Sequence, residues 1–230
     1  MNGHLARPLA ARLNGLSALP LLPDNAAPVP AHVIDAAKAA LDRGETHYTD
    51  RAGVPVLRAL VAARIEKQCG VQIDPKAITI TCGLAEARSV AVRVLTKPGT
   101  AILCPQGFAE VAGVAHLIGA EMITQLDQPV SLAYLTPADP PEIMQAAIAS
   151  GAAIVWDLTH SGPAAHPALD PAIAPRVTTI DSLDAQFPGW RIGWLAGSEM
   201  ADRLRGFKQS LTICTTSVSQ WAAVEWLQKQ

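Results

Sequence analysis

The feature that most restricts the fold of this chain is a regular alternation of short β-branched runs with longer helical stretches. The runs ITITC (78–82), AAIVWD (152–157) and VTTIDS (177–182) have the composition of buried strands. Stretches such as 84–96 instead carry apolar residues at helical spacing. Because such alternation usually places helices on both faces of a mostly parallel sheet, we expect a three-layer α/β/α sandwich over residues 31–230.

The remaining segments repeat this rhythm, and glycine or proline separates many of them. Further helices are expected at 31–43, 54–69, 107–119, 141–151, 198–211 and 216–230, and further strands at 101–105, 121–126, 132–137 and 190–197. Ser198 is a candidate N-cap for the helix that it would open. Proline recurs from Pro20 to Pro30 and favours extended backbone, so we interpret residues 1–30 as an N-terminal arm.

Composition excludes several classes of function. The net charge is −2, aromatic residues make up 4% of the chain, and lysine and arginine do not cluster, which argues against nucleic-acid binding. No apolar run reaches the roughly 18 residues of a membrane span, and the N-terminus lacks the apolar core of a signal peptide. The four cysteines form no CxxC pair and the histidines are dispersed, so we expect no metal site and a cytoplasmic protein with free thiols.

Two strand ends carry residues that suit a ligand. No dinucleotide fingerprint, P-loop or nucleophile elbow is present. In open α/β sheets, however, ligands bind at the carboxyl ends of strands. Gly83 follows a strand and opens a helix, and free N–H groups at a helix N-terminus suit a phosphate. Asp157 ends another strand and can pair with a protonated ring nitrogen, although this pattern alone is more typical of a helix cap or a loop carboxylate.

Five ordered segments resemble one known family. They are HYTDRAGVPVLRALVA (47–62), ITITCGLAEARSVAVRVLTKPGTAILCPQGF (78–108), IVWD (154–157), IDSLDAQFPGWRIGWLAG (180–197) and CTTSVSQWAAVEWL (214–227). Their order and spacing, from about residue 20 to 230, are similar to the large, cofactor-binding domain of the pyridoxal-phosphate-dependent aminotransferases of class I and II, fold type I. Five matches in order are more specific than any one of them.

The resemblance implies a cofactor-binding role for eight residues. In the family, a glycine-turn backbone, a serine and an arginine hold the phosphate, an acid keeps the pyridine nitrogen protonated, and an aromatic side chain stacks on the ring. A tyrosine reaches the phosphate of the neighbouring subunit. The matching positions are Gly83, Leu84, Ala85, Ser182 and Arg191 for the phosphate, Asp157 for the nitrogen, Phe108 for the ring face, and Tyr48 for the neighbouring subunit.

One departure from the family pattern removes its central chemistry. The family motif Ser-x-Ser-Lys, aligned on Ser182, places Ala185 at the lysine position, and no lysine occurs between Lys97 and Lys208. The imine with the cofactor and the proton transfer at the substrate both require that amine. We therefore expect no catalytic residue, and pyridoxal 5'-phosphate, if bound, to be held without a covalent bond.

Other positions depart as well. The chain ends at Gln230, before the small domain that carries the family's substrate-binding arginine, so we expect that C-terminal domain to be missing. Asp139 replaces an asparagine that contacts the ring oxygen, and an acid would repel that oxygen. His160 stands where the family often has a tyrosine. Several functional positions have thus changed together, while framework positions have not.

Three interpretations follow from these residues. In the first, the protein does not transaminate alone and acts as a binding or partner subunit, in a homodimer or with an aminotransferase-type chain, with a small amino acid as a candidate ligand. In the second, it is an aminotransferase that another chain completes, or an enzyme that uses the cofactor without an internal imine. In the third, it is a remnant without ligand or has another fold. Trp221 and Trp226 of the last helix are then core residues or interface anchors.

Overall fold

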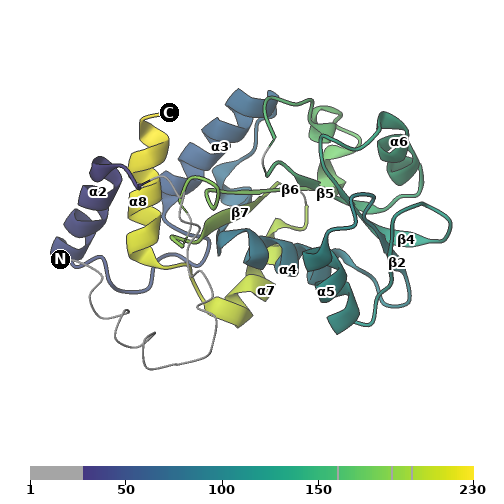
Figure 1. Ribbon diagram of the computed structural model, residues 1–230, viewed down its shortest axis with the longest axis horizontal. Helices are drawn as coiled ribbons and strands as arrows, with labels where there is room; N and C mark the ends of the chain where they lie inside the picture. The colour runs from purple at the N-terminus through teal and green to yellow at the C-terminus, as the bar shows by residue number, and fades with distance from the viewer. Residues whose placement is uncertain (1–27, 160, 188, 198) are drawn as a thin grey trace, which may run out of the picture.

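The described residues of this computed structural model, 28–159, 161–187, 189–197 and 199–230, form a seven-stranded sheet. Its order is β1-β7-β6-β5-β4-β2-β3. Figure 1 labels the middle of this series, from β7 to β2. The strands are β1 (Ile78–Cys82), β2 (Ala101–Leu103), β3 (Met122–Ile123), β4 (Val130–Leu135), β5 (Ala153–Asp157), β6 (Val177–Ser182) and β7 (Ile192–Ala196). The strand β7 runs antiparallel to both of its neighbours, and the pairs from β6 to β3 are parallel.

Helices cover both faces of this sheet, which confirms the predicted three-layer sandwich. They are α2 (Ala31–Asp42), α3 (Pro55–Cys69), α4 (Gly83–Leu95), α5 (Ala109–Leu117), α6 (Pro141–Ala149), α7 (Ala201–Thr212) and α8 (Ser217–Gln228), with 3-10 turns η1 (Pro75–Ala77), η2 (Pro167–Leu169) and η3 (Ala174–Arg176). One buried cluster joins the sheet to α3, α6 and α8, and the other joins it to α4, α5 and α7. The helix α2 packs on α8 at one end of the molecule (Figure 1).

Strand composition explains why the sheet is buried on both faces. Successive side chains of a strand point to opposite faces. In β4, Leu132 and Tyr134 enter the cluster beneath α4, whereas Ala133 and Leu135 enter the cluster beneath α3. Every residue of β4 is buried, as expected of a parallel strand between two layers of helices. Neither face of the strand is therefore left to solvent.

Most predicted elements agree with the structure to within one to three residues, with two informative differences. The strand expected at 121–126 is reduced to β3, an edge strand whose one neighbour among the described strands is β2. The helix expected from 198 begins at Ala201, after Met200, and Ser198, the predicted N-cap, lies outside the described residues. Most of the predicted N-terminal arm and His160 lie outside them as well.

None of the helices in the described ranges has both the length and the apolar character of a membrane span. No group of three or more histidine, cysteine or acidic side chains in the same ranges is arranged to hold a metal ion.

Candidate functional site

The candidate site lies where the carboxyl ends of β1, β5 and β6 meet the N-terminal turn of α4. The strand β1 ends at Cys82, and Gly83 turns directly into α4 with a φ of 74°. A Cβ at Gly83 would lie 2.5 Å from the Arg191 Cζ, and one at Gly193 would lie 2.7 Å from the Gly83 carbonyl carbon. Only glycine fits such an approach, so these two residues allow β1, β7 and Arg191 to pack closely.

A carboxylate occupies the N-terminus of α4. The Leu84 backbone N–H donates to the Asp184 Oδ2 at 2.9 Å, and the Arg191 guanidinium contacts the same oxygen at 3.0 Å. Arg191 also donates to the Cys82 carbonyl at 3.4 Å. An anion at a helix N-terminus is stabilised by free N–H groups and by the helix dipole. We call Gly83, Leu84, Asp184 and Arg191 the turn end of the site.

The loop after β6 holds Asp184 and Arg191 in place. The Asp184 backbone N–H donates to the Ser182 hydroxyl at 3.2 Å, which fixes the start of the loop. At its end, Arg191 has a φ of 57°, a left-handed conformation that costs a non-glycine residue about 1–2 kcal/mol. This conformation precedes β7, which is why the strand predicted from residue 190 begins only at Ile192. The ion pair with Asp184 and the tight contact with Gly83 offset part of that cost.

The second half of the site is a buried cluster around Asp157. The Asp157 side chain is 2% exposed, and its Oδ2 accepts hydrogen bonds from Arg88 Nη2 at 2.9 Å and from the Tyr134 hydroxyl at 2.5 Å. Its Oδ1 accepts the Thr159 backbone N–H at 2.8 Å. Arg88 Nε in turn donates to the Tyr134 oxygen at 2.7 Å. Both carboxylate oxygens therefore have partners within the chain.

Aromatic rings cover the Arg88 guanidinium. Its Cζ lies 5.1 Å from the Phe108 ring centroid and 5.9 Å from that of Tyr134, which are distances of cation–π contacts. The two rings meet edge to face at 5.8 Å. The exposed Glu110 carboxylate lies 3.7 Å from Arg88 Nη1. We call Arg88, Phe108, Tyr134 and Asp157 the ring end.

The protonation states at the ring end follow from burial and charge. Burial opposes a charged guanidinium, but Tyr134 and Asp157 outweigh that effect and raise the pKa of Arg88. Burial and the neighbouring Asp157 also raise the pKa of the Tyr134 hydroxyl. At neutral pH the arginine is therefore charged and the phenol neutral, so Tyr134 is a donor to Asp157.

The structure places the predicted site residues in three groups. Gly83, Leu84 and Arg191 meet at the turn end, and Ser182 supports it through Asp184. Asp157 and Phe108 meet at the ring end through Arg88. The remaining two predicted positions, Ala85 and Tyr48, are exposed.

Tyr48 is 81% exposed and lies with Cys214, Thr215 and Thr216 beside a surface hollow of about 500 Å³. The loop that carries it is anchored by the buried Gln220, which accepts the Val54 backbone N–H at 2.8 Å and donates to the Thr215 carbonyl at 2.8 Å.

Lys208 is the buried lysine nearest in sequence to the expected imine position. It lies in α7, is fully buried, and its Nζ has no hydrogen-bond partner within the described residues. Its charged or titratable neighbours are Glu86, Cys214 and Cys82, and burial lowers its pKa. The position aligned with the imine lysine, Ala185, is exposed in the loop after β6.

Asp139, where the family has an asparagine, has local partners. Its Oδ2 accepts the Thr136 backbone N–H at 2.7 Å, and its Oδ1 accepts the Gln106 side chain at 2.8 Å. The carboxylate thus closes the turn after β4, which is an ordinary structural role for aspartate.

Sequence reasoning missed three residues of the two ends, Arg88, Tyr134 and Asp184. Two of them, Arg88 and Asp184, had a signal. Arg88 interrupts an otherwise apolar stripe of α4 that includes Leu84, Ala91 and Leu95, and a charge on a buried face requires a partner. Asp184 takes the position of the second serine in the Ser-x-Ser-Lys motif, which places an acid where the family has a neutral hydroxyl.

The residues of this site do not fit pyridoxal phosphate in the arrangement that the structure shows. Its phosphate would require the Leu84 N–H and Arg191, and both are bonded to Asp184. Its ring nitrogen would require Asp157, which is bonded to Arg88 and Tyr134. The chain has the residue types of the cofactor site, but two of its own side chains occupy the charged positions.

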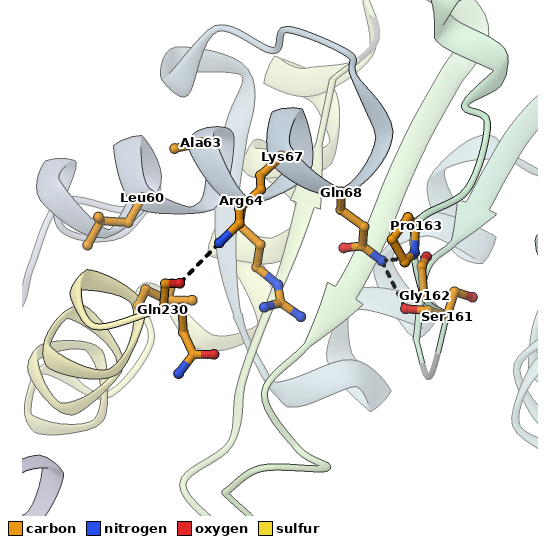
Figure 2. Close-up of a pocket in the computed structure, with 10 residues that line it drawn as sticks. Leu60, Ala63, Arg64, Lys67, Gln68, Ser161, Gly162, Pro163 and Gln230 are labelled. Atoms are coloured by element: carbon orange, nitrogen blue, oxygen red, sulfur yellow. Dashed lines mark hydrogen bonds between the residues drawn. The ribbon is translucent and has the colours of Figure 1, made fainter.

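A separate cavity of about 380 Å³ lies between α3, the end of α8 and the loop at 161–163. Figure 2 shows Gln68 of α3 reaching this loop, where its amide donates to the carbonyls of Ser161 at 3.0 Å and Gly162 at 3.3 Å. Lys67 donates to the Gln230 carbonyl at 3.0 Å on the other side. The residues that line this cavity include none of the eight predicted cofactor positions.

Comparison with known proteins agrees with the architecture. Residues 17–127 match the family model described as aminotransferase class I and II. An aspartate aminotransferase of Geobacillus stearothermophilus is 24% identical over 85% of the chain, which spans 60% of that enzyme. A probable aspartate aminotransferase of Methanocaldococcus jannaschii is 37% identical over 33% of the chain and 20% of the enzyme.

Solved structures show the same fold. The aspartate aminotransferase of Rhizobium meliloti aligns with a TM-score of 0.78 at 23% identity, over 96% of this chain and 66% of that one. A protein of Escherichia coli with a methionine aminotransferase function aligns with a TM-score of 0.79 at 20% identity, over 97% of this chain and 69% of that one. The chain therefore spans about two thirds of each of these two solved structures. It spans 60% or less of the two curated relatives named above.

Proposed function

Because this chain is a relative of the class I and II aminotransferases, we propose that it is a member of this group that does not transaminate alone and acts as a binding or partner subunit. The observation that carries the proposal is Ala185. It follows Asp184 in the loop after β6, where the family's imine lysine is expected, and a methyl group cannot form an imine or move a proton.

The positions of two other lysines, Lys208 and Lys97, support this proposal. Lys208 is buried among α7, α4 and β1, and its titratable neighbours are Glu86, Cys82 and Cys214 rather than Asp157. Lys97 lies in the loop after α4, at the opposite end of that helix from Gly83. Pyridoxal phosphate bound by this chain would therefore be held without a covalent bond.

A partner role is supported by the surface around Tyr48. The exposed phenol projects from a loop that Gln220 anchors, so the position is fixed while the ring remains available to a second chain. Leu211 and Ile213 are also exposed, close in sequence to Cys214 and Thr216 of the same hollow. A homodimer, or a complex with an aminotransferase-type chain, in the cytoplasm is part of the proposal, and the four free thiols agree with that compartment.

The experiment is reduction of the purified protein with borohydride after incubation with pyridoxal phosphate, followed by intact mass and peptide mapping. We expect only scattered, substoichiometric labelling of exposed lysines such as Lys38 and Lys229. Pyridoxal without the phosphate, treated in the same way, sets that background. A stoichiometric pyridoxyl adduct on one lysine, together with transamination by the chain alone, would refute the proposal.

A second measurement tests the partner role. Light scattering gives the oligomeric state of the wild type and of a Tyr48→Ser variant, and transamination is assayed with and without an added aminotransferase. We expect a dimer that the Tyr48→Ser change weakens, or activity that changes when the second chain is added. A monomer with no effect on the added enzyme would contradict it.

A further inference from the structure

We propose that Arg88 and Asp184 are internal occupants of the two charged positions of the cofactor site and keep it closed to phosphate-bearing ligands. This inference rests on the proposed function only for the location of that site. The ligand class that it concerns is the phosphomonoester dianion, of which inorganic phosphate is the simplest probe. The prediction is that removal of one carboxylate, Asp184, opens a phosphate site that the wild type does not offer.

At the turn end, the Asp184 carboxylate makes the contacts that a phosphate would make. It accepts the backbone N–H of Leu84 in the first turn of α4 and pairs with Arg191. The cradle at Gly83 is filled, because Arg191 and Asp184 atoms lie within 2.5–2.8 Å of where a Cβ would stand. A phosphate that entered would meet a like charge as well as a lack of space, and both effects disfavour binding.

At the ring end, the Arg88 guanidinium makes the contacts expected of a protonated pyridine ring. It is planar and cationic, lies against Phe108, and donates to Asp157. With a side chain 11% exposed, it is a component of the core rather than a surface residue that turns toward solvent. A ring that sought the Asp157 carboxylate would have to displace both Arg88 and the Tyr134 hydroxyl.

Both occupants contact the start of α4. Asp184 accepts the backbone N–H of Leu84, and Arg88 lies four residues further along the same helix. At each end an arginine faces an aspartate, Arg191 facing Asp184 and Arg88 facing Asp157, and the exposed Glu110 carboxylate also lies near Arg88. The phosphate of a cofactor would therefore have to displace Asp184 from Arg191, and its ring cation would have to displace Arg88 from Asp157.

The test is calorimetric titration of the wild type, Asp184→Ala and a control, Asp35→Ala, first with inorganic phosphate and then with pyridoxal phosphate. Asp35 is an exposed acid on α2 paired with Lys38, so the control removes the same charge away from the site. We expect Asp184→Ala to bind both anions at least about tenfold more tightly than the other two proteins. Equal affinity in all three proteins would overturn the inference.

A second readout locates the binding. In the amide spectrum of labelled protein, the Leu84 signal should move on addition of phosphate in Asp184→Ala but not in the wild type. Movement of the wild-type Leu84 signal at the same phosphate concentration would also overturn the inference. Tight, non-covalent binding of pyridoxal phosphate by the wild type would refute this closed site while leaving the proposed function intact, because only a covalent adduct contradicts the latter.

Discussion

The ring end and the turn end of the site are built on the same principle but in different surroundings. Each pairs an arginine with an aspartate at about 3 Å. At the ring end the two side chains are 11% and 2% exposed, and at the turn end 43% and 21%. Water screens the second pair and hardly reaches the first. The same chemical pair should therefore be essential to folding at one end and nearly dispensable at the other.

Loss of Arg88 should have the largest effect. An Arg88→Leu change leaves Asp157 buried without a cationic partner among the described residues, next to the Tyr134 hydroxyl and the Thr159 N–H, and an uncompensated buried charge costs about 3–5 kcal/mol. We expect urea denaturation to show a loss of that size. The double variant Arg88→Leu/Asp157→Asn should recover most of it, because the charge is removed with its partner. A single variant as stable as the wild type would show that the ring end is not a buried ion pair.

The loss of stability at acid pH should come from His166, which lies on the opposite face of β5 from the ring end. His166 packs edge to face on Trp156, bonds Thr179 at 2.8 Å, and burial lowers its pKa to about 4. Its folded-state pKa is below the unfolded value of about 6.5, so stability is full above pH 6.5 and falls as the pH drops toward 4.

The loss expected over that range is up to about 3 kcal/mol, from about 1.4 kcal/mol per pKa unit. A His166→Asn variant should show a flatter profile between pH 6.5 and 4 in the same denaturation assay. If its profile had the wild-type slope, the acid sensitivity would belong to another group.

Removal of the phenol alone should have an intermediate effect. Tyr134→Phe keeps the ring that packs on Phe108 but deletes the donor to Asp157 and the acceptor of Arg88 Nε. We expect a loss of about 1–3 kcal/mol, the usual cost of leaving buried hydrogen-bonding groups unsatisfied. Leu135→Ala, which truncates a core side chain on the other face of β4, measures the stability lost to a packing defect in the same strand. A Tyr134→Phe variant with unchanged stability would mean that the hydroxyl is not part of the network.

The turn end should respond least. Asp184→Ala removes a partly exposed pair with Arg191, and such pairs contribute about 1 kcal/mol or less. A double-mutant cycle of Asp184 and Arg191 should lose its coupling in high salt, whereas the cycle of Arg88 and Asp157 should keep it, because salt screens only the exposed pair. Equal salt dependence at both ends would contradict the contrast in burial.

The fold was largely predictable because its signals are local. Apolar runs such as 153–157, separated by helical stretches, are enough to indicate a layered sheet, and β5 and β6 lie within the predicted ranges. The antiparallel pairing of β7 and the shortness of β3 were not predicted, since both depend on which strands become neighbours. The periodicity of a segment does not specify its partner in the sheet.

The site was predictable only in part. The resemblance to a family placed Gly83, Asp157 and Arg191, and the structure brings each of them to one of the two ends. It did not indicate Arg88 or Asp184, because their partners lie 69 and 100 residues away along the chain. These pairings arise only when α4, β5 and the loop after β6 come together. Departures from a family pattern therefore require the fold before they can be interpreted.

The most direct test of this account is a crystal structure of the wild type grown with excess pyridoxal phosphate. The account predicts that Arg88 still bonds Asp157, that Asp184 still bonds the Leu84 N–H, and that no ring lies against Phe108. Density for a pyridine ring on Asp157 and for a phosphate between Leu84 and Arg191, with Arg88 and Asp184 displaced, would contradict it.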